Sequence, residues 1–303
     1  MTESSTVTIS SSDRDDDPAA RSSSQIALNT ALLCGWIEFW YQPKIDLSKR
    51  QMMGAEVFAR ARHPAHGILP PAAFMAGADV DSLTTLTEHA LLSALETSNK
   101  LARAGINLPI TINVPVTLLG KYPFSKLVQR HRPDVEKWAG LVFDIPEQQI
   151  FSESSLIGTV IEKLSPHGIR FAADDFGRSL SAMIGVDNFF TPSNEPLEDV
   201  LRALERLGSL GVVEMKLDRS FVTDSNTDRR SASICKAMID LAHALGTKVV
   251  GIGVEKSTDL EMLMQMGCDI GQGFVFGQPM TQQEFVRLLR GRAEQLGRKN
   301  GKN

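Results

Sequence analysis

Two adjacent carboxylates, Asp174 and Asp175, are the residues of this chain whose type and spacing point most directly to chemistry. They close a mostly apolar run, residues 168–173, which has the composition of a buried strand. Adjacent aspartates repel each other, so both stay ionised in a partly desolvated site only when a metal ion, a lysine or an arginine compensates their charge. The pair therefore predicts a cation-containing site at the end of a strand.

The elements that must position this pair are short strands alternating with helices. From about residue 26, apolar runs of strand length alternate with amphipathic stretches such as 81–104 and 258–266, which is typical of β/α units around a parallel sheet. Eight such runs favour a TIM-like (β/α)8 barrel over an open doubly wound sheet, because the chain has no glycine-rich dinucleotide turn. The expected strands are residues 37–45, 53–59, 110–114, 141–145, 169–173, 212–217, 248–254 and 270–276.

Polar side chains stand at the carboxyl ends of most of these expected strands. In a barrel of this kind those ends meet at one mouth, where such barrels place their active sites. Oxygen ligands without an organised set of His or Cys are what Mg²⁺ and Mn²⁺ prefer. Taken singly, each residue has an equally good structural interpretation, because a strand-end carboxylate also caps helices or pairs with Lys or Arg. The set, in strand order, is Glu56, Asn113, Asp144, Asp174 with Asp175, Lys216 with Asp218, Glu255 and Gln272.

Length and charge narrow the class of protein. The 303 residues suffice for a large core, and a formal net charge of -4 gives no basic face for general nucleic-acid binding. No apolar stretch reaches the length of a membrane span and the first residues lack a signal-peptide pattern, so we expect a cytoplasmic protein without membrane contact. The three scattered cysteines, Cys34, Cys235 and Cys268, suit a reducing compartment and are expected to be core thiols.

Three regions are expected along the chain. Residues 1–24 are rich in Ser, Thr and Asp and have too little apolar surface to order themselves, so they predict a disordered tail. Residues 25–292 are expected to form one barrel domain, followed by a basic C-terminal tail, residues 293–303. Within the barrel, an extended segment of about residues 187–209 carries apolar residues at helical spacing, which predicts an additional amphipathic helix.

Several motifs occur in an order and spacing that resemble a known family. They are Tyr41-Gln42-Pro43, Glu56-Val57-Phe58 with Arg60 and His63-Pro64, Ile112-Asn113-Val114, Asp144-Ile145-Pro146-Glu147, Asp174-Asp175-Phe176-Gly177, Lys216-Leu217-Asp218-Arg219, Gly253-Val254-Glu255 and Gln272-Gly273-Phe274. Over roughly residues 26–290, the chain resembles the EAL family, the bacterial phosphodiesterases that linearise cyclic di-GMP, together with their catalytically degenerate relatives.

The resemblance implies a role for each matching position. In active members of the family two metal ions hold the scissile phosphate and activate a water molecule. The matching metal positions are Glu56, Asn113, Asp144, Asp174 and Asp175. The matching catalytic positions are Lys216, which orients the water, and Glu255. The matching contacts to the dinucleotide are Gln42, Arg60 and Gln272, and a guanidinium such as that of Arg60 is well suited to a phosphate.

Departures from the family pattern weaken the expected metal site. Ile252 stands where the family has a metal-binding glutamate, and an isoleucine offers no ligand. Asp144 replaces a glutamate, which withdraws the carboxylate by about 1.5 Å, whereas ligand distances tolerate only about 0.2 Å. Arg178, after the aspartate pair, has two open interpretations: it adds positive charge to Asp174 and Asp175, or it faces solvent. We therefore expect Mg²⁺ or Mn²⁺ binding to be weakened or lost.

The expected function is that of a degenerate EAL domain with no or weak phosphodiesterase activity. Such a domain acts as a cyclic di-GMP sensor or as a protein-interaction regulator in bacterial signalling. The alternative is an active metal-dependent phosphodiesterase that yields the linear dinucleotide. Cyclic di-GMP, a protein partner and a second copy in a homodimer are the expected partners. The extended segment leaves three roles open: it docks a partner, remodels the dimer or packs on the barrel.

Overall fold

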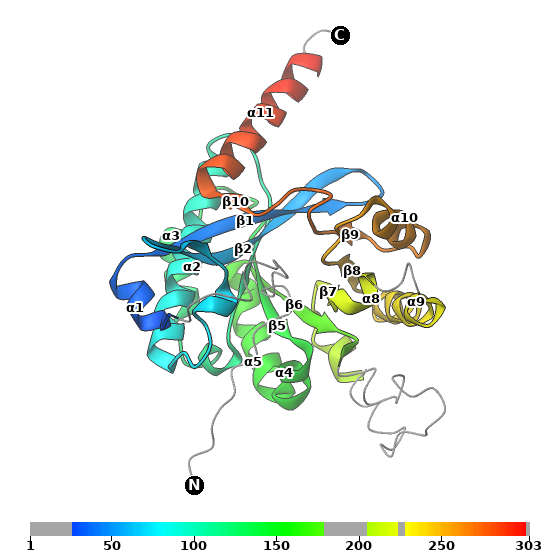
Figure 1. Ribbon diagram of the computed structural model, residues 1–303, viewed down its shortest axis with the longest axis horizontal. Helices are drawn as coiled ribbons and strands as arrows, with labels where there is room; N and C mark the ends of the chain where they lie inside the picture. Colours follow the sequence, from blue (N-terminus) through cyan, green and yellow to red (C-terminus); the bar gives the residue numbers. More distant parts are fainter. Residues whose placement is uncertain (1–25, 179–204, 224–227, 301–303) are drawn as a thin grey trace.

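The computed structural model describes residues 26–178, 205–223 and 228–300, and within these ranges ten strands form one sheet. Eight of them close into the predicted barrel, because β1 pairs with β2 on one side and with β9 on the other (Figure 1). Two short strands, β3 (Gly67–Leu69) and β10 (Met280–Thr281), pair with β2 and β1. The order around the barrel is β1 (Ile37–Asp46), β2 (Gln51–His63), β4 (Ile110–Asn113), β5 (Leu141–Pro146), β6 (Ile169–Phe176), β7 (Glu214–Leu217), β8 (Lys248–Gly251) and β9 (Ile270–Gly271).

One strand of the barrel, β1, departs from the parallel arrangement of the others. This strand runs antiparallel to both neighbours, with Tyr41 opposite Val57 and Ile45 opposite Gly271. Only residues 47–50 separate β1 from β2, and a parallel connection needs a crossover of a dozen or more residues. Side chains from β1 therefore enter the interior from a strand that runs opposite to the rest.

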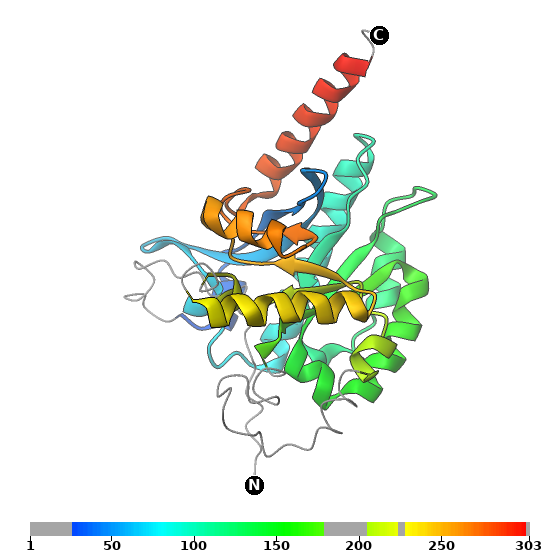
Figure 2. The ribbon, with the colours of Figure 1, turned by 90° about the vertical axis from the view of Figure 1, so that its right-hand side faces the viewer.

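Helices cover the outside of the barrel (Figures 1 and 2), and the longest of them begins at an aspartate cap. Asp79 accepts a hydrogen bond from Ser82 N at 2.7 Å at the start of α2 (Val80–Ala102). The predicted helices at 81–104 and 258–266 are confirmed as α2 and α10 (Ser257–Gln265). The other helices are α1 (Leu28–Leu33), α3 (Phe124–His131), α4 (Glu147–Ser152), α5 (Ser154–Leu164), α8 (Arg219–Thr223), α9 (Arg229–Ala244), α11 (Gln282–Asn300) and the 3-10 turns η3 (Pro71–Ala73), η4 (Val116–Leu118) and η5 (Ser165–His167).

Strand alternation separates an apolar outer layer from a polar interior. On β7, Met215 and Leu217 belong to the main hydrophobic core, whereas Glu214 and Lys216 carry buried charges that meet side chains from distant strands. Successive side chains of a strand point to opposite faces, so the charged pair lies inside the barrel and the apolar pair lies against the helices. The interior of this barrel is therefore the place where polar chemistry gathers.

Some expectations fall outside the described residues or need correction. The predicted tail 1–24 and residues 187–204 of the extended segment lie outside them, while residues 205–209 are helical. Helix α11 projects from the barrel and continues to Asn300, beyond the predicted boundary at 292 (Figures 1 and 2). Cys34 is exposed at the end of the short helix α1, so the expectation of a core thiol is wrong there; Cys235 and Cys268 are buried. Within the described ranges, no helix has the length and apolar character to span a bilayer.

Candidate functional site

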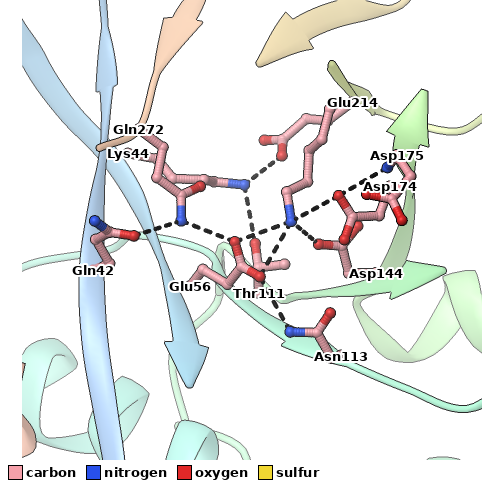
Figure 3. A network of polar contacts seen from close by, with 11 residues as sticks. Gln42, Lys44, Glu56, Thr111, Asn113, Asp144, Asp174, Asp175, Glu214 and Gln272 are labelled. Atoms are coloured by element: carbon pink, nitrogen blue, oxygen red, sulfur yellow. Dashed lines mark hydrogen bonds and ion pairs between the residues drawn. The ribbon is translucent and has the colours of Figure 1, made fainter. Parts of the chain in front are cut away.

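The centre of the candidate site is the ammonium group of Lys216, which is fully buried in the barrel (Figure 3). Its Nζ atom lies 3.1 Å from Oε2 of Glu56 and 3.2 Å from Oδ1 of Asp174, and it forms a third ion pair with Oδ2 of Asp144. Burial alone would lower the pKa of Lys216, but the three carboxylates outweigh it and raise this pKa well above its usual value. The lysine therefore stays charged and holds β2, β5 and β6 to β7.

Three carboxylates surround the single ammonium of Lys216, so negative charge is in excess there. This excess adds to the effect of burial on the pKa of Asp144. Burial raises the pKa of Asp144 well above its usual value; Lys216 opposes the shift, and the charges of Asp174 and Glu56 add to it. Among the described residues, the buried Oδ1 atom of Asp144 has no hydrogen-bond partner. Asp144 therefore takes up a proton more readily than an ordinary aspartate does.

Amide side chains hold the remaining acid, Glu56, from the other side of the interior (Figure 3). Gln272 donates from Nε2 to Glu56 Oε2 at 2.9 Å and to Gln42 Oε1 at 3.2 Å. Asn113 donates from Nδ2 to Glu56 Oε1 at 3.1 Å, and Gln42 donates to the carbonyl of Gly277 at 3.2 Å. One network therefore unites predicted metal and nucleotide positions from β1, β2, β4 and the loop after β9.

The aspartate pair sits where the backbone of β6 turns sharply. Asp175 is buried and has a φ of 55°, in the left-handed region that residues other than glycine rarely occupy. Two residues later Gly177 donates its N–H to Oε1 of the buried Glu147, on α4, at 3.1 Å. Glu147 is a site residue to which sequence reasoning gave no role, and it anchors the turn that directs Asp174 toward Lys216.

Ile252, which the resemblance predicts to replace a family glutamate, lies in an apolar cluster. Its side chain is 3% exposed and packs with Val250, Ile270 and the partly buried Met53. Hydrocarbon side chains offer no atom to a cation. The side chain at position 252 is therefore part of a hydrophobic cluster.

The structure places two other predicted residues in different surroundings. Glu255 has a side chain that is 38% exposed and forms an ion pair with Arg219, so it does not share the buried setting of the acids around Lys216. Arg60 is buried, with its guanidinium carbon 5.7 Å from the centroid of the Phe58 ring and Nη1 donating to the carbonyl of Ala59 at 2.9 Å. Arg60 and Glu56 lie four residues apart on the same face of β2.

Asp218 directly precedes α8 and contacts both Ser220 and Arg178. Asp218 Oδ1 accepts hydrogen bonds from Ser220 N at 2.8 Å and from Ser220 Oγ at 2.6 Å at the start of α8. A half-exposed Arg178 places Nη1 3.9 Å from Asp218 Oδ2. The positive charge of Arg178 is thus directed at Asp218.

A second buried ion pair escaped sequence reasoning. Lys44 is 1% exposed, pairs with the buried Glu214, and donates to Thr111 Oγ1 at 3.0 Å (Figure 3). The signal was present, because Lys44 lies two positions from Gln42 and Glu214 two positions from Lys216, which places each pair on one face of its strand. The charges of Lys44 and Glu214 within expected strands are what could have revealed them.

A divalent cation would have to compete with Lys216 for the same oxygens. The carboxylates of Glu56, Asp144 and Asp174 are ion-paired with the ammonium, and Ile252 supplies no ligand. In the described part of the chain, no three His, Cys, Asp or Glu side chains are arranged to hold a metal ion. Only Asp144 Oδ1 offers the cluster an open carboxylate acceptor. As arranged, these residues fit an ammonium rather than Mg²⁺ or Mn²⁺, and binding of either metal stays a prediction.

Known proteins share both the sequence pattern and the fold. The sequence profile of the EAL domain matches residues 25–189 and 200–279. The chain is 31% identical over 263 residues to the cyclic di-GMP phosphodiesterase RocR of Pseudomonas aeruginosa, a match that covers 85% of this chain and 61% of RocR. It is 29% identical over 255 residues to the cyclic di-GMP phosphodiesterase PA2567 of the same organism, covering 82% of this chain and 39% of PA2567. The chain thus spans less than two thirds of the length of these relatives.

Solved structures agree with this assignment. The PaMucR phosphodiesterase in its complex with c-di-GMP superposes with a TM-score of 0.68 at 25% identity, covering 85% of this chain and 97% of that one. The family profile matches most of the chain, including every strand that delivers a side chain to Lys216. This chain therefore belongs to the EAL domain family.

Proposed function

We propose that this chain is a degenerate EAL domain that binds cyclic di-GMP and cleaves it slowly or not at all. The observation that carries this proposal is the burial of Ile252 in an apolar cluster at the position of a family metal ligand. A two-metal mechanism that lacks one ligand loses transition-state stabilisation, and each loss of about 1.36 kcal/mol slows the reaction tenfold. Such a domain acts as a nucleotide sensor or as a protein-interaction regulator in bacterial signalling.

Nucleotide binding is supported by what remains of the site. Gln42 and Gln272 are linked by a hydrogen bond, and Arg60 lies on the same strand face as Glu56. A guanidinium suits a phosphate because it presents several N–H donors in a fixed plane. PaMucR, the structural relative described above, is a phosphodiesterase seen with c-di-GMP. These features favour a dinucleotide ligand for this chain as well.

The alternative function is an active Mg²⁺- or Mn²⁺-dependent phosphodiesterase that gives the linear dinucleotide. In its favour, Glu56, Asn113, Asp174 and Lys216 lie in one network, and Asp144 Oδ1 is open to a further partner. In this alternative Glu56, Asn113 and Asp174 would hold the metal ion, which would supply positive charge for the phosphate and activate a water molecule. RocR and PA2567 carry the phosphodiesterase activity in their names.

Partners and location follow from the same proposal. A regulator without turnover must pass the information that nucleotide is bound to another protein. The proposal therefore includes a protein partner and a homodimer. It places the protein in the cytoplasm, where cyclic di-GMP acts as a signal. Chromatography with light scattering, with and without the dinucleotide, measures the oligomeric state. A monomer at all concentrations would remove the homodimer from the proposal.

One experiment separates the two functions. Purified protein is titrated with cyclic di-GMP by calorimetry in Mn²⁺ and in EDTA, and the linear dinucleotide is followed by chromatography. Binding with no linear product supports the sensor, whereas turnover of roughly 1 per second or faster establishes the phosphodiesterase. If the protein neither binds nor cleaves cyclic di-GMP, the protein-interaction regulator is the function that remains.

A matched pair of arginines on β2 tests the proposed pocket. Arg60→Ala is expected to weaken binding of cyclic di-GMP. Arg62→Ala is the control, because Arg62 is more than half exposed and pairs with Glu38. Equal effects of the two substitutions would contradict a specific role for Arg60.

A further inference from the structure

The buried ion pair of Lys44 and Glu214 spans the barrel interior. β1 and β7 are not hydrogen-bonded neighbours, so the lysine side chain crosses the interior to reach the glutamate. Their side chains are 1% and 7% exposed, and Thr111 Oγ1 accepts a hydrogen bond from Lys44 Nζ at 3.0 Å. Charges buried to this degree are costly unless they are paired, so this arrangement calls for an explanation.

The pair lies one step along the strands from the candidate site. Glu214 and Lys216 share a face of β7, while Lys44 and Gln42 share a face of β1. Residues two apart on a strand are separated by about 6.6 Å. Figure 3 shows the Lys44–Glu214 contact close to Glu56, Asp144 and Asp174, the three partners of Lys216. A long, flexible lysine side chain covers such a distance by changing its rotamers.

Glu214 would therefore be a competitor for Lys216 if it lacked its own cation. An unpaired buried carboxylate attracts the nearest ammonium strongly, because the interior screens charge poorly. Movement of Lys216 toward Glu214 would leave Glu56, Asp144 and Asp174 without their shared counterion. Uncompensated acids at that place would repel the phosphates of a nucleotide.

We propose that Lys44 is a positioning residue: it neutralises Glu214 and thereby leaves the Lys216 ammonium to the three site carboxylates. This inference rests on the proposed binding of cyclic di-GMP for its effect on affinity. The position of Lys216 follows from the charges alone. Lys44 thus acts on the nucleotide site through Lys216, without touching the ligand.

A purely structural ion pair makes a different prediction from this asymmetric role. If the pair only holds strands together, loss of either partner should harm the site equally. If Lys44 acts by occupying Glu214, Lys44→Met harms the site, while Glu214→Gln removes the competitor and spares it. The double variant Lys44→Met with Glu214→Gln then restores what the single lysine substitution lost.

The experiment measures cyclic di-GMP affinity by calorimetry and the position of Lys216 by crystallography in the wild type and the three variants. Lys44→Met is expected to bind about tenfold more weakly, equivalent to about 1.4 kcal/mol, with Lys216 Nζ moved from Asp174 to Glu214. The double variant is expected to bind within about threefold of the wild type. If Lys44→Met does not fold, Lys44→Gln takes its place, because its amide keeps a donor for Thr111.

Two outcomes would overturn the inference. One is Lys216 remaining on Asp174 in Lys44→Met with unchanged affinity. The other is an equal loss of affinity in Lys44→Met and Glu214→Gln, which would assign the pair to strand packing. A wild-type protein that binds no dinucleotide overturns the proposed function instead, and the crystallographic position of Lys216 in Lys44→Met still decides the role of Lys44.

Discussion

Lys216 Nζ lies 3.2 Å from Oδ1 of Asp174, on the neighbouring strand, and both side chains are fully shielded from solvent. The contact joins the aspartate pair, Asp174 and Asp175, to a cation supplied by the protein itself. Asp174 therefore has a counterion within the folded chain. The consequences of this arrangement are measurable in stability, pH dependence and metal binding.

Loss of the central ammonium should be costly. Lys216→Met leaves Glu56, Asp144 and Asp174 buried without their counterion, and breaking a buried ion pair in this way costs about 3–5 kcal/mol. Urea denaturation at neutral pH measures the change in the free energy of unfolding. Lys248→Met is the control, since Lys248 is exposed at the start of β8. A loss below about 1 kcal/mol would mean that water or another group replaces the lysine.

Asp144 should give stability a specific dependence on pH. Its pKa is raised in the folded protein, so the folded state binds the proton more tightly than the unfolded state, whose pKa is about 3.9. The stabilisation due to this group is fully present below about pH 4 and is lost as pH rises through the raised pKa. Asp144→Asn removes that loss.

The measurement compares the free energy of unfolding of wild type and Asp144→Asn by urea denaturation between about pH 4 and 8. The difference is expected to shift in favour of the variant as the pH rises. Asp134→Asn, at an exposed position, controls for general effects of removing an acid. Parallel curves for wild type and Asp144→Asn would refute the assignment.

Metal affinity should increase when the two family glutamates are restored. Ile252→Glu adds a carboxylate where an apolar side chain now packs, and Asp144→Glu lengthens the reach of another. The double variant is expected to bind Mn²⁺ at least about tenfold more tightly than the wild type, which calorimetry or electron paramagnetic resonance detects. Asp144→Glu alone should give a smaller gain. No gain in the double variant would show that the pocket has been remodelled beyond these positions.

Gly273 should be intolerant of any side chain. A Cβ atom at this residue would lie 2.3 Å from backbone N and O of Val254, and backbone atoms give way less easily than a side chain. Gly267→Ala is a matched control, because Gly267 has a φ of 84° but nothing within 4 Å of its Cβ position. Gly273→Ala should destabilise the protein by about 1–3 kcal/mol more than Gly267→Ala in thermal or urea unfolding. Equal losses would show that the loop after Gln272 is free to move.

The sequence determined the barrel and most members of the site. Apolar runs of strand length that alternate with amphipathic stretches were enough to predict eight strands, and each observed barrel strand overlaps one of the expected ranges. Polar residues within a strand, such as Glu56, or at its end, such as Asn113, were visible because they interrupt apolar runs. Closure of the barrel then brings distant strands together, and so several members of the network around Lys216 could be expected from local pattern, whereas Lys44 and Glu214 were missed.

Only the tertiary structure decided which charges meet. The alternation of side chains along a strand predicts that Lys44 and Glu214 face inward. Only the closed barrel, however, brings these two residues together from 170 positions apart in the chain. The closed barrel likewise places Lys216 among three acids and leaves Glu255 paired with Arg219, although Lys216 and Glu255 were both expected at strand ends. The energy of a buried charge depends on its nearest partners and on the solvent that remains, and both are set by the packing of strands far apart in sequence.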